Sequence, residues 1–225
     1  MMNFKSPSMK NILFLALLLL VANASATDTT YFAVLRNSLA LADHEYSVAT
    51  YQNLANTCDR IIAIRENEWL PHYYRAYAYA FLGYMTKDEE EKDRMLDRAQ
   101  VSADAAFSMN PGESEIQLLF ALICYGRMEI NSMIRAATYF PKSDAALERA
   151  RELNAKNPRI YYLEGKSTLN KPEFMGGGAA TALPILEKAL QCYKEFKATF
   201  DIYPHWGEEE SIRLYEECKG RIAQE

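Results

Sequence analysis

From residue 27 onward, apolar side chains recur three and four positions apart, with polar residues between them. One stretch with this spacing has its apolar positions at Leu54, Ala55, Cys58, Ile61 and Ile62. Such spacing places the apolar side chains on one face of an α-helix. Strict alternation of apolar and polar residues, which would indicate a half-buried strand, does not persist over six residues. The pattern therefore predicts an all-α protein.

Prolines interrupt the helical pattern at similar intervals. Pro71, Pro111, Pro158 and Pro204 follow one another at distances of 40, 47 and 46 residues. A period in the forties is typical of stacked helical hairpins. We therefore expect four hairpins and a closing helix. The expected pairs are residues 30–43 with 47–65, 70–85 with 89–108, 113–134 with 143–155, and 159–169 with 179–200, and the closing helix is expected at 208–223.

Small side chains repeat in a finer register within these hairpins. The same separations occur in Ala99, Ala103, Ala106, Pro111 and again in Ala146, Ala150, Leu153, Pro158. A narrow stripe of small residues lets a second helix approach closely. Ahead of the first stretch, Ala76, Tyr79 and Gly83 have the spacing small-x2-Tyr-x3-Gly.

Taken together, these positions resemble the tetratricopeptide repeat (TPR), a helix–turn–helix of 34 residues. The resemblance implies a right-handed superhelix of about four TPR-like hairpins plus a C-terminal capping helix, formed as one domain by residues 27–225. Polar insertions at 87–94 and 131–142 depart from the repeat. They could leave the concave groove of such a superhelix open or fill it.

The last third of the chain carries a narrower resemblance. The segments Asn157-Pro158-Arg159, Gly176–Gly178 and Pro204–Gly207 are similar to exported bacterial repeat proteins of uncharacterised function, in which the glycine run joins two helices of a repeat. Backbone amides of a glycine run before a helix can also hold an anion. The lysine and hydroxyl that a phosphate-binding loop needs immediately after its last glycine are replaced here by Ala179 and Ala180, so we favour a tight turn with positive φ.

The first 26 residues have the features of a cleavable signal peptide. Lys5 and Lys10 precede an apolar run at 12–22, and Ala24 and Ala26 have the small-x-small spacing of a cleavage site. The apolar run is shorter than the ~20 residues that a membrane-spanning helix needs. We therefore expect cleavage after Ala26, a periplasmic or secreted protein, and no stable membrane insertion of the mature chain.

Charge and composition exclude some classes of function and support none that is catalytic. The formal net charge is −5, which gives no basic surface for a nucleic acid. The three histidines, His44, His72 and His205, are far apart and have no zinc-ligand spacing. His-Glu-x-x-His and Gly-x-Ser-x-Gly motifs do not occur. We therefore predict no enzyme, no metal site and no cofactor.

The four cysteines, at 58, 124, 192 and 218, do not form CxxC pairs. An exported protein can form disulfides. Cys192 and Cys218 lie at similar distances from the predicted turn at 200–207, so antiparallel helices could bring them together. Cys58 and Cys124 fall on small-residue stripes and are expected to be buried thiols.

Binding is the function that this sequence favours. In TPR-like arrays the first helix of each hairpin lines the concave face, which places Tyr73, Tyr77, Arg159, Tyr162 and Lys166 toward the groove. Tyrosine and arginine are enriched in recognition surfaces. We therefore predict an exported, non-catalytic scaffold that binds a protein or peptide partner there. The alternative is a periplasmic small-molecule-binding or accessory transport subunit, supported by the 15 tyrosines of the chain.

Overall fold

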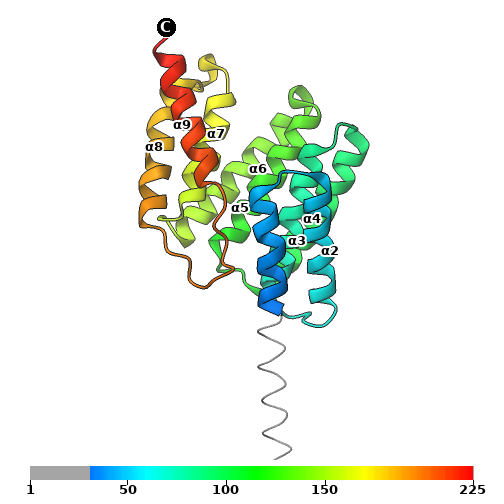
Figure 1. The fold of residues 1–225 in the computed structure, drawn as a ribbon. Coiled ribbons are helices and arrows are strands. Elements are labelled where there is room, and N and C mark those ends of the chain that lie inside the picture. The colour runs from blue at the N-terminus through cyan, green and yellow to red at the C-terminus, as the bar shows by residue number, and fades with distance from the viewer. Residues whose placement is uncertain (1–30, 225) are drawn as a thin grey trace, which may run out of the picture.

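A computed structural model describes residues 31–224 of the chain (Figure 1). Every regular element in this part is helical, which confirms the predicted all-α class. No helix of residues 31–224 is long and apolar enough to cross a bilayer. The predicted signal peptide and its cleavage site lie outside the described residues.

The helices pair in chain order, as the proline spacing predicts. A helix over residues 31–44 precedes α2, and three further hairpins pair α3 with α4, α5 with α6 and α7 with α8. Contacts of α3 with α5 and of α5 with α7 join successive hairpins, and α9 packs on α8. The bounds are α2 Val48–Ile62, α3 Trp69–Met85, α4 Glu89–Met109, α5 Ser114–Ile130, α6 Ser132–Leu153, α7 Pro158–Asn170, α8 Ala179–Glu195 and α9 Glu208–Ile222.

The two insertions lengthen helices instead of forming loops. Asp88 caps α4 by accepting a hydrogen bond from the Glu91 amide, and Asn131 caps α6 through the Ile134 amide. Between these extensions, the Asp93 carboxylate accepts hydrogen bonds from both Arg127 and Arg135. The insertions therefore join α4, α5 and α6 at the same end of the hairpins.

Small residues lie where the register predicts close helix packing. Ala99, Ala103 and Ala106 are all completely buried. A Cβ atom added to Gly165 of α7 would lie 2.7 Å from a methyl carbon of Leu186 on α8. These contacts agree with TPR-like hairpins, whereas the right-handed superhelix itself stays a prediction.

A tight turn links α7 to α8, as expected from the glycine run. Gly176 and Gly178 have φ of 80° and 93°, values that L side chains rarely adopt. The Gly178 amide donates to the Thr168 carbonyl at 3.0 Å, which closes the turn onto α7. The run therefore has a structural role.

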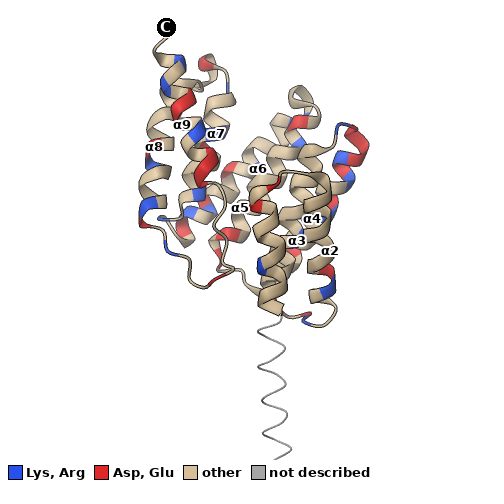
Figure 2. Ribbon diagram, in the orientation of Figure 1, with Lys and Arg blue, Asp and Glu red and all other residues tan. Residues whose placement is uncertain are grey.

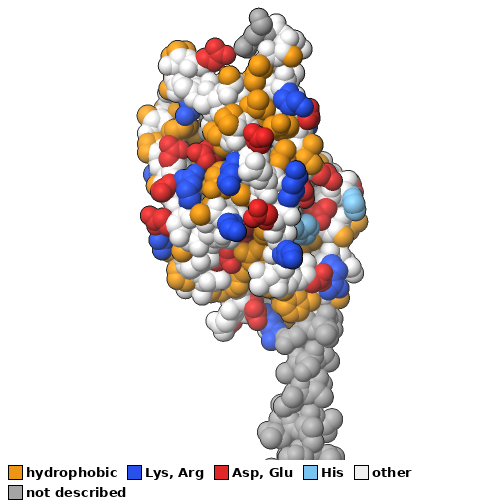
Figure 3. All heavy atoms as spheres, turned by 90° about the vertical axis from the view of Figure 1, so that its left-hand side faces the viewer, with side chains coloured by type: hydrophobic (Ala, Val, Ile, Leu, Met, Phe, Trp, Pro, Cys, Tyr) orange, Lys and Arg blue, Asp and Glu red, His pale blue; other side chains and the backbone are white. Residues whose placement is uncertain are grey.

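An irregular segment, residues 196–207, connects α8 to α9 and is called the strap below. It leaves the end of α8, passes alongside the 31–44 helix and returns to the start of α9 (Figure 1). On the neighbouring face formed by α8 and α9, charged side chains of both signs are interspersed with apolar ones (Figure 3). This face therefore has no continuous basic surface.

Candidate binding groove

A groove of about 1000 Å³ lies where α3, α5 and α7 follow one another. The 31–44 helix and α2 form one wall, and the strap and the start of α9 form the other. Volumes of roughly 300–1000 Å³ are typical of small-molecule pockets. The size of the groove therefore suits an organic ligand.

Aromatic rings dominate the groove. In α3, Tyr77 and Phe81 are one helical turn apart, with ring centroids 4.5 Å apart. The ring of Tyr51 on α2 stacks on Phe81 at 5.1 Å with an interplanar angle of 12°. The ring centroid of Trp206 in the strap lies 5.5 Å from that of Tyr77 and 6.0 Å from that of Tyr162 on α7. The full aromatic lining is Tyr46, Tyr51, Tyr77, Phe81, Tyr84, Tyr162 and Trp206.

The charged residues of the groove lie at its rim. Lys166 on α7 and Arg213 on α9 supply basic groups, but Arg213 is already paired with Glu210 and Glu217. The first turn of α9, Glu208–Glu210, adds carboxylates that complement the helix dipole (Figure 2). Lys166 therefore has more capacity than Arg213 to bind an anionic group.

The two histidines of the groove differ in whether their ring nitrogens are already hydrogen-bonded within the protein. Both ring nitrogens of His205 are engaged, Nδ1 with the Tyr203 carbonyl at 3.2 Å and Nε2 with the Asp43 carboxylate at 3.1 Å. Because both partners only accept, the full pair of bonds needs the imidazolium. The hydrogen bond with Asp43 accordingly raises the pKa of His205. His44 is exposed, and Tyr46 next to it on the rim is 62% exposed.

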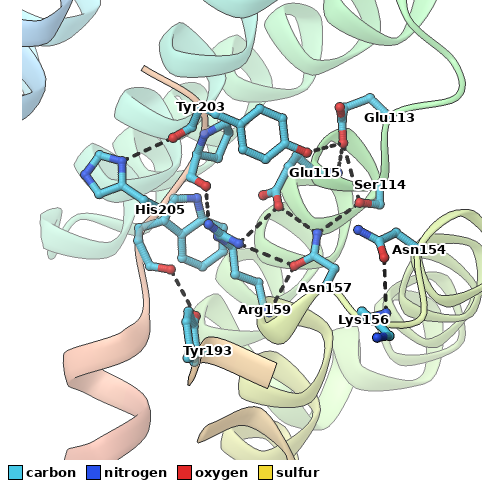
Figure 4. A network of polar contacts seen from close by, with 12 residues as sticks. Glu113, Ser114, Glu115, Asn154, Lys156, Asn157, Arg159, Tyr193, Tyr203 and His205 are labelled. Carbon is cyan, nitrogen blue, oxygen red and sulfur yellow. Dashed lines mark hydrogen bonds and ion pairs between the residues drawn. The ribbon is translucent and has the colours of Figure 1, made fainter. Parts of the chain in front are cut away.

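A buried polar network fixes the strap behind the groove (Figure 4). Glu115 of α5 and Arg159 of α7 are both fully buried and form an ion pair of 3.2 Å. The Asn157 amide donates to Glu115 at 2.6 Å, and Arg159 donates to the Pro204 carbonyl. Burial raises the pKa of Glu115 to about 7, and the charge of Arg159 opposes that shift. The pair therefore holds the strap to α5 and α7.

Further hydrogen bonds extend this attachment to other helices. Tyr74 of α3 donates to the Ile202 carbonyl at 2.9 Å, and Tyr193 of α8 donates to the Trp206 carbonyl at 3.0 Å. The Tyr203 hydroxyl donates to Glu113 at 2.9 Å. The strap is therefore a fixed wall of the groove, anchored at several points.

The five predicted contact residues separate into two groups. Tyr77, Tyr162 and Lys166 line the groove, whereas Tyr73 and Arg159 are fully buried behind it. The last two therefore position the strap and do not form part of the groove surface.

Sequence reasoning missed five aromatic residues of the groove, which are Tyr46, Tyr51, Phe81, Tyr84 and Trp206. Trp206 was visible only within the Pro204–Gly207 resemblance, and Tyr46 only as part of the tyrosine excess. Helical periodicity carries no signal for Trp206 in the irregular strap or for Tyr46 in the link between the 31–44 helix and α2, so neither could be assigned to the groove.

The disulfide suggested for Cys192 and Cys218 is absent from the described residues. Cys192 and Cys218 are buried free thiols in this structure, as are Cys58 and Cys124, so the predicted pairing is not formed here. Burial raises the pKa of each of the four thiols. Among residues 31–224, no cluster of three or more His, Cys, Asp or Glu side chains could hold a metal ion.

Comparison with known proteins identifies a related solved structure. No protein-family profile and no curated protein sequence matches the chain. Among solved structures, the chain is similar to the HusA haemophore from Porphyromonas gingivalis, with 32% sequence identity and a TM-score of 0.76. The similarity covers 85% of this chain and 94% of the haemophore. This identity over nearly the full length of the relative shows that the chain belongs to the family of the HusA haemophore.

Proposed function

We propose that this protein is an exported, non-catalytic carrier that binds haem, or a closely similar porphyrin, in the aromatic groove. The observation that carries the proposal is the groove itself, with rings on both walls and a family member that is a haemophore. A porphyrin is flat and apolar on both faces, and aromatic side chains offer it large contact areas. The proposal corresponds to the small-molecule alternative of the sequence analysis.

Two features of the rim support this ligand. Haem iron is held in proteins by His, Tyr, Cys or Met side chains. His44 and Tyr46 are at the open edge, whereas both nitrogens of His205 are occupied. Haem also carries carboxylates, and Lys166 is the basic group with free capacity. We therefore place the iron toward His44 and Tyr46 and the carboxylates toward Lys166.

The protein or peptide partner predicted from the sequence remains the alternative occupant of the groove. Trp206 stands between α3 and α7 and divides the space that a long peptide would follow. A compact ligand is therefore favoured. Export, which a haemophore requires, agrees with the predicted signal peptide.

Haem titration of the mature chain, Thr27–Glu225, tests the proposal. A Soret band that shifts and saturates at a one-to-one ratio is expected, together with quenching of the tryptophan fluorescence, to which Trp69 and Trp206 both contribute. Lys166→Ala should weaken binding roughly tenfold through loss of one charge-assisted contact. Its matched control is Lys188→Ala, which removes an exposed lysine of α8 outside the groove.

Two results would count against haem in the groove. One is a Soret band that never saturates, which indicates non-specific adsorption. The other is equal weakening by Lys166→Ala and Lys188→Ala. If haem does not bind, but the wild type captures an envelope protein that the Tyr77→Ala variant does not capture, the groove would bind a peptide or protein partner.

A further inference from the structure

A second cavity, of about 470 Å³, lies between α6 and α7, and Tyr125 of α5 also lines it. It shares no lining residue with the aromatic groove. Ser167 faces this cavity while the preceding residue, Lys166, faces the groove, so the two spaces lie on different sides of α7.

The cavity exists because one helix interface is loosely packed. In the preceding hairpins α4 packs closely on α5, whereas the equivalent contact of α6 with α7 is much smaller. Pro141 lies inside α6, next to Phe140 of the cavity wall. The resulting space is partly open to solvent and is large enough for a small organic molecule.

Three hydroxyl groups line this space. The hydroxyl of Tyr125 is buried and forms no well-oriented hydrogen bond with residues 31–224, although the hydroxyls of Ser143 and Ser167 lie near it. Ser167 and Thr168 contribute two more hydroxyls to the same wall. A ligand with several hydrogen-bonding atoms would satisfy them.

Two opposite charges face the cavity without pairing. Asp144 of α6 and Lys171, just after α7, both line it, and neither forms an ion pair among residues 31–224. Lys171 instead places its ammonium 4.6 Å from the centroid of the Phe140 ring. Burial raises the pKa of Asp144, and the charge of Lys171 opposes this shift.

The other charges of the cavity are already paired. Arg151 donates to Glu148 at 2.5 Å and to Glu164 at 2.8 Å. Asp144 and Lys171 are therefore the groups with free capacity, one for a cation and one for an anion.

From this arrangement we propose a second ligand site, for a small zwitterion with an apolar body, such as an amino acid or a dipeptide. The ligand ammonium binds Asp144, its carboxylate binds Lys171, and its polar atoms reach the hydroxyls of Tyr125 and Ser167. Phe140 and Leu147 contact its apolar part. The site is independent of haem binding.

L-Phenylalanine is the probe, added to the mature chain and followed by backbone amide shifts in NMR. Saturable shifts confined to the neighbourhood of Tyr125 and to residues 140–151 and 164–171 are expected, with a Kd of about 1 mM or below. Asp144→Asn and Lys171→Gln should each weaken binding roughly tenfold, while 2-phenylethylamine and 3-phenylpropionate, which each lack one charge, should bind correspondingly less.

A conservative variant separates ligand binding from folding. Tyr125→Phe removes an unpaired hydroxyl, so it should leave the melting temperature unchanged or higher. The same change should weaken the binding of L-phenylalanine. Haem titration should be the same in all three variants as in the wild type. Three results would overturn the proposal, whether or not haem binds in the groove. They are the absence of saturable shifts, shifts outside the cavity, and equal binding of the singly charged analogues.

Discussion

The indole Nε1 of Trp206 donates a hydrogen bond of 2.7 Å to the hydroxyl of Tyr73, 133 residues earlier in the chain. That hydroxyl in turn lies 3.4 Å from a carboxylate oxygen of Glu115. A side chain of the groove wall is thereby connected to the buried ion pair behind it. Mutations in the network should therefore alter ligand binding as well as stability.

The first prediction concerns this hydrogen bond. Trp206→Phe keeps an aromatic ring against Tyr77 but removes the donor, and we expect a loss of about 1 kcal/mol in the free energy of unfolding. Haem binding should also weaken. Urea unfolding and haem titration measure the two effects. Tyr73→Phe also removes the contact of this hydroxyl with Glu115, so in a double-mutant cycle the two losses should add to less than their sum, and full additivity would show that the Trp206–Tyr73 bond contributes nothing.

The second prediction concerns the buried pair. Glu115→Ala leaves the Arg159 guanidinium buried without its counter-charge, which should cost about 3–5 kcal/mol. Replacing both residues together, as Glu115→Leu with Arg159→Met, should recover much of that loss because no charge stays buried. Denaturant unfolding of the single and double variants checks this. A double variant less stable than Glu115→Ala would contradict it.

Sequence reasoning succeeded where the determinants are local. The helical hairpins follow from apolar spacing and from proline positions, and the close packing at Ala99, Ala103 and Ala106 follows from a stripe of small residues. The start of α4 was predicted correctly, but α6 was not, because Asn131 acts as an N-cap and begins α6 at Ser132, eleven residues before the predicted start at 143.

The groove was only partly predictable because the strap reaches it over a long sequence distance. Tyr73 and Tyr77 are one turn apart on α3 and look equivalent in the sequence. The strap buries Tyr73 against Trp206 and leaves Tyr77 in the groove wall. Nothing local to α3 distinguishes them, and the same holds for Arg159 against Lys166 on α7.

The third prediction is a pH dependence from His205. Its pKa is raised in the folded protein, so its contact with Asp43 stabilises the fold fully below pH ~6.5, the unfolded value, and this contribution is lost as pH rises through the folded pKa. Since both side chains are partly exposed, the effect should stay below about 1 kcal/mol.

Thermal unfolding between pH 5 and pH 9 measures this pH dependence of stability. Besides Asp43, the backbone carbonyl of Tyr203 favours the imidazolium, and the charge of Arg159 disfavours it. Asp43→Asn should remove most of the pH dependence that His205→Gln removes. If Asp43→Asn leaves the profile unchanged, the pairing of His205 with Asp43 has no energetic role.

The fourth prediction compares two glycines in helices. Gly165→Ala would place a Cβ 2.7 Å from Leu186, where the backbone of α7 approaches α8, and overpacking of this kind costs about 1–3 kcal/mol. Gly220, in α9, has no atom within 4 Å of the position that a Cβ would take. Gly220→Ala should instead stabilise the protein by up to about 1 kcal/mol, because alanine favours the helix. Opposite shifts of the unfolding midpoint are therefore expected, and stabilisation by Gly165→Ala would mean that α7 and α8 are not held as closely as the hairpin geometry requires.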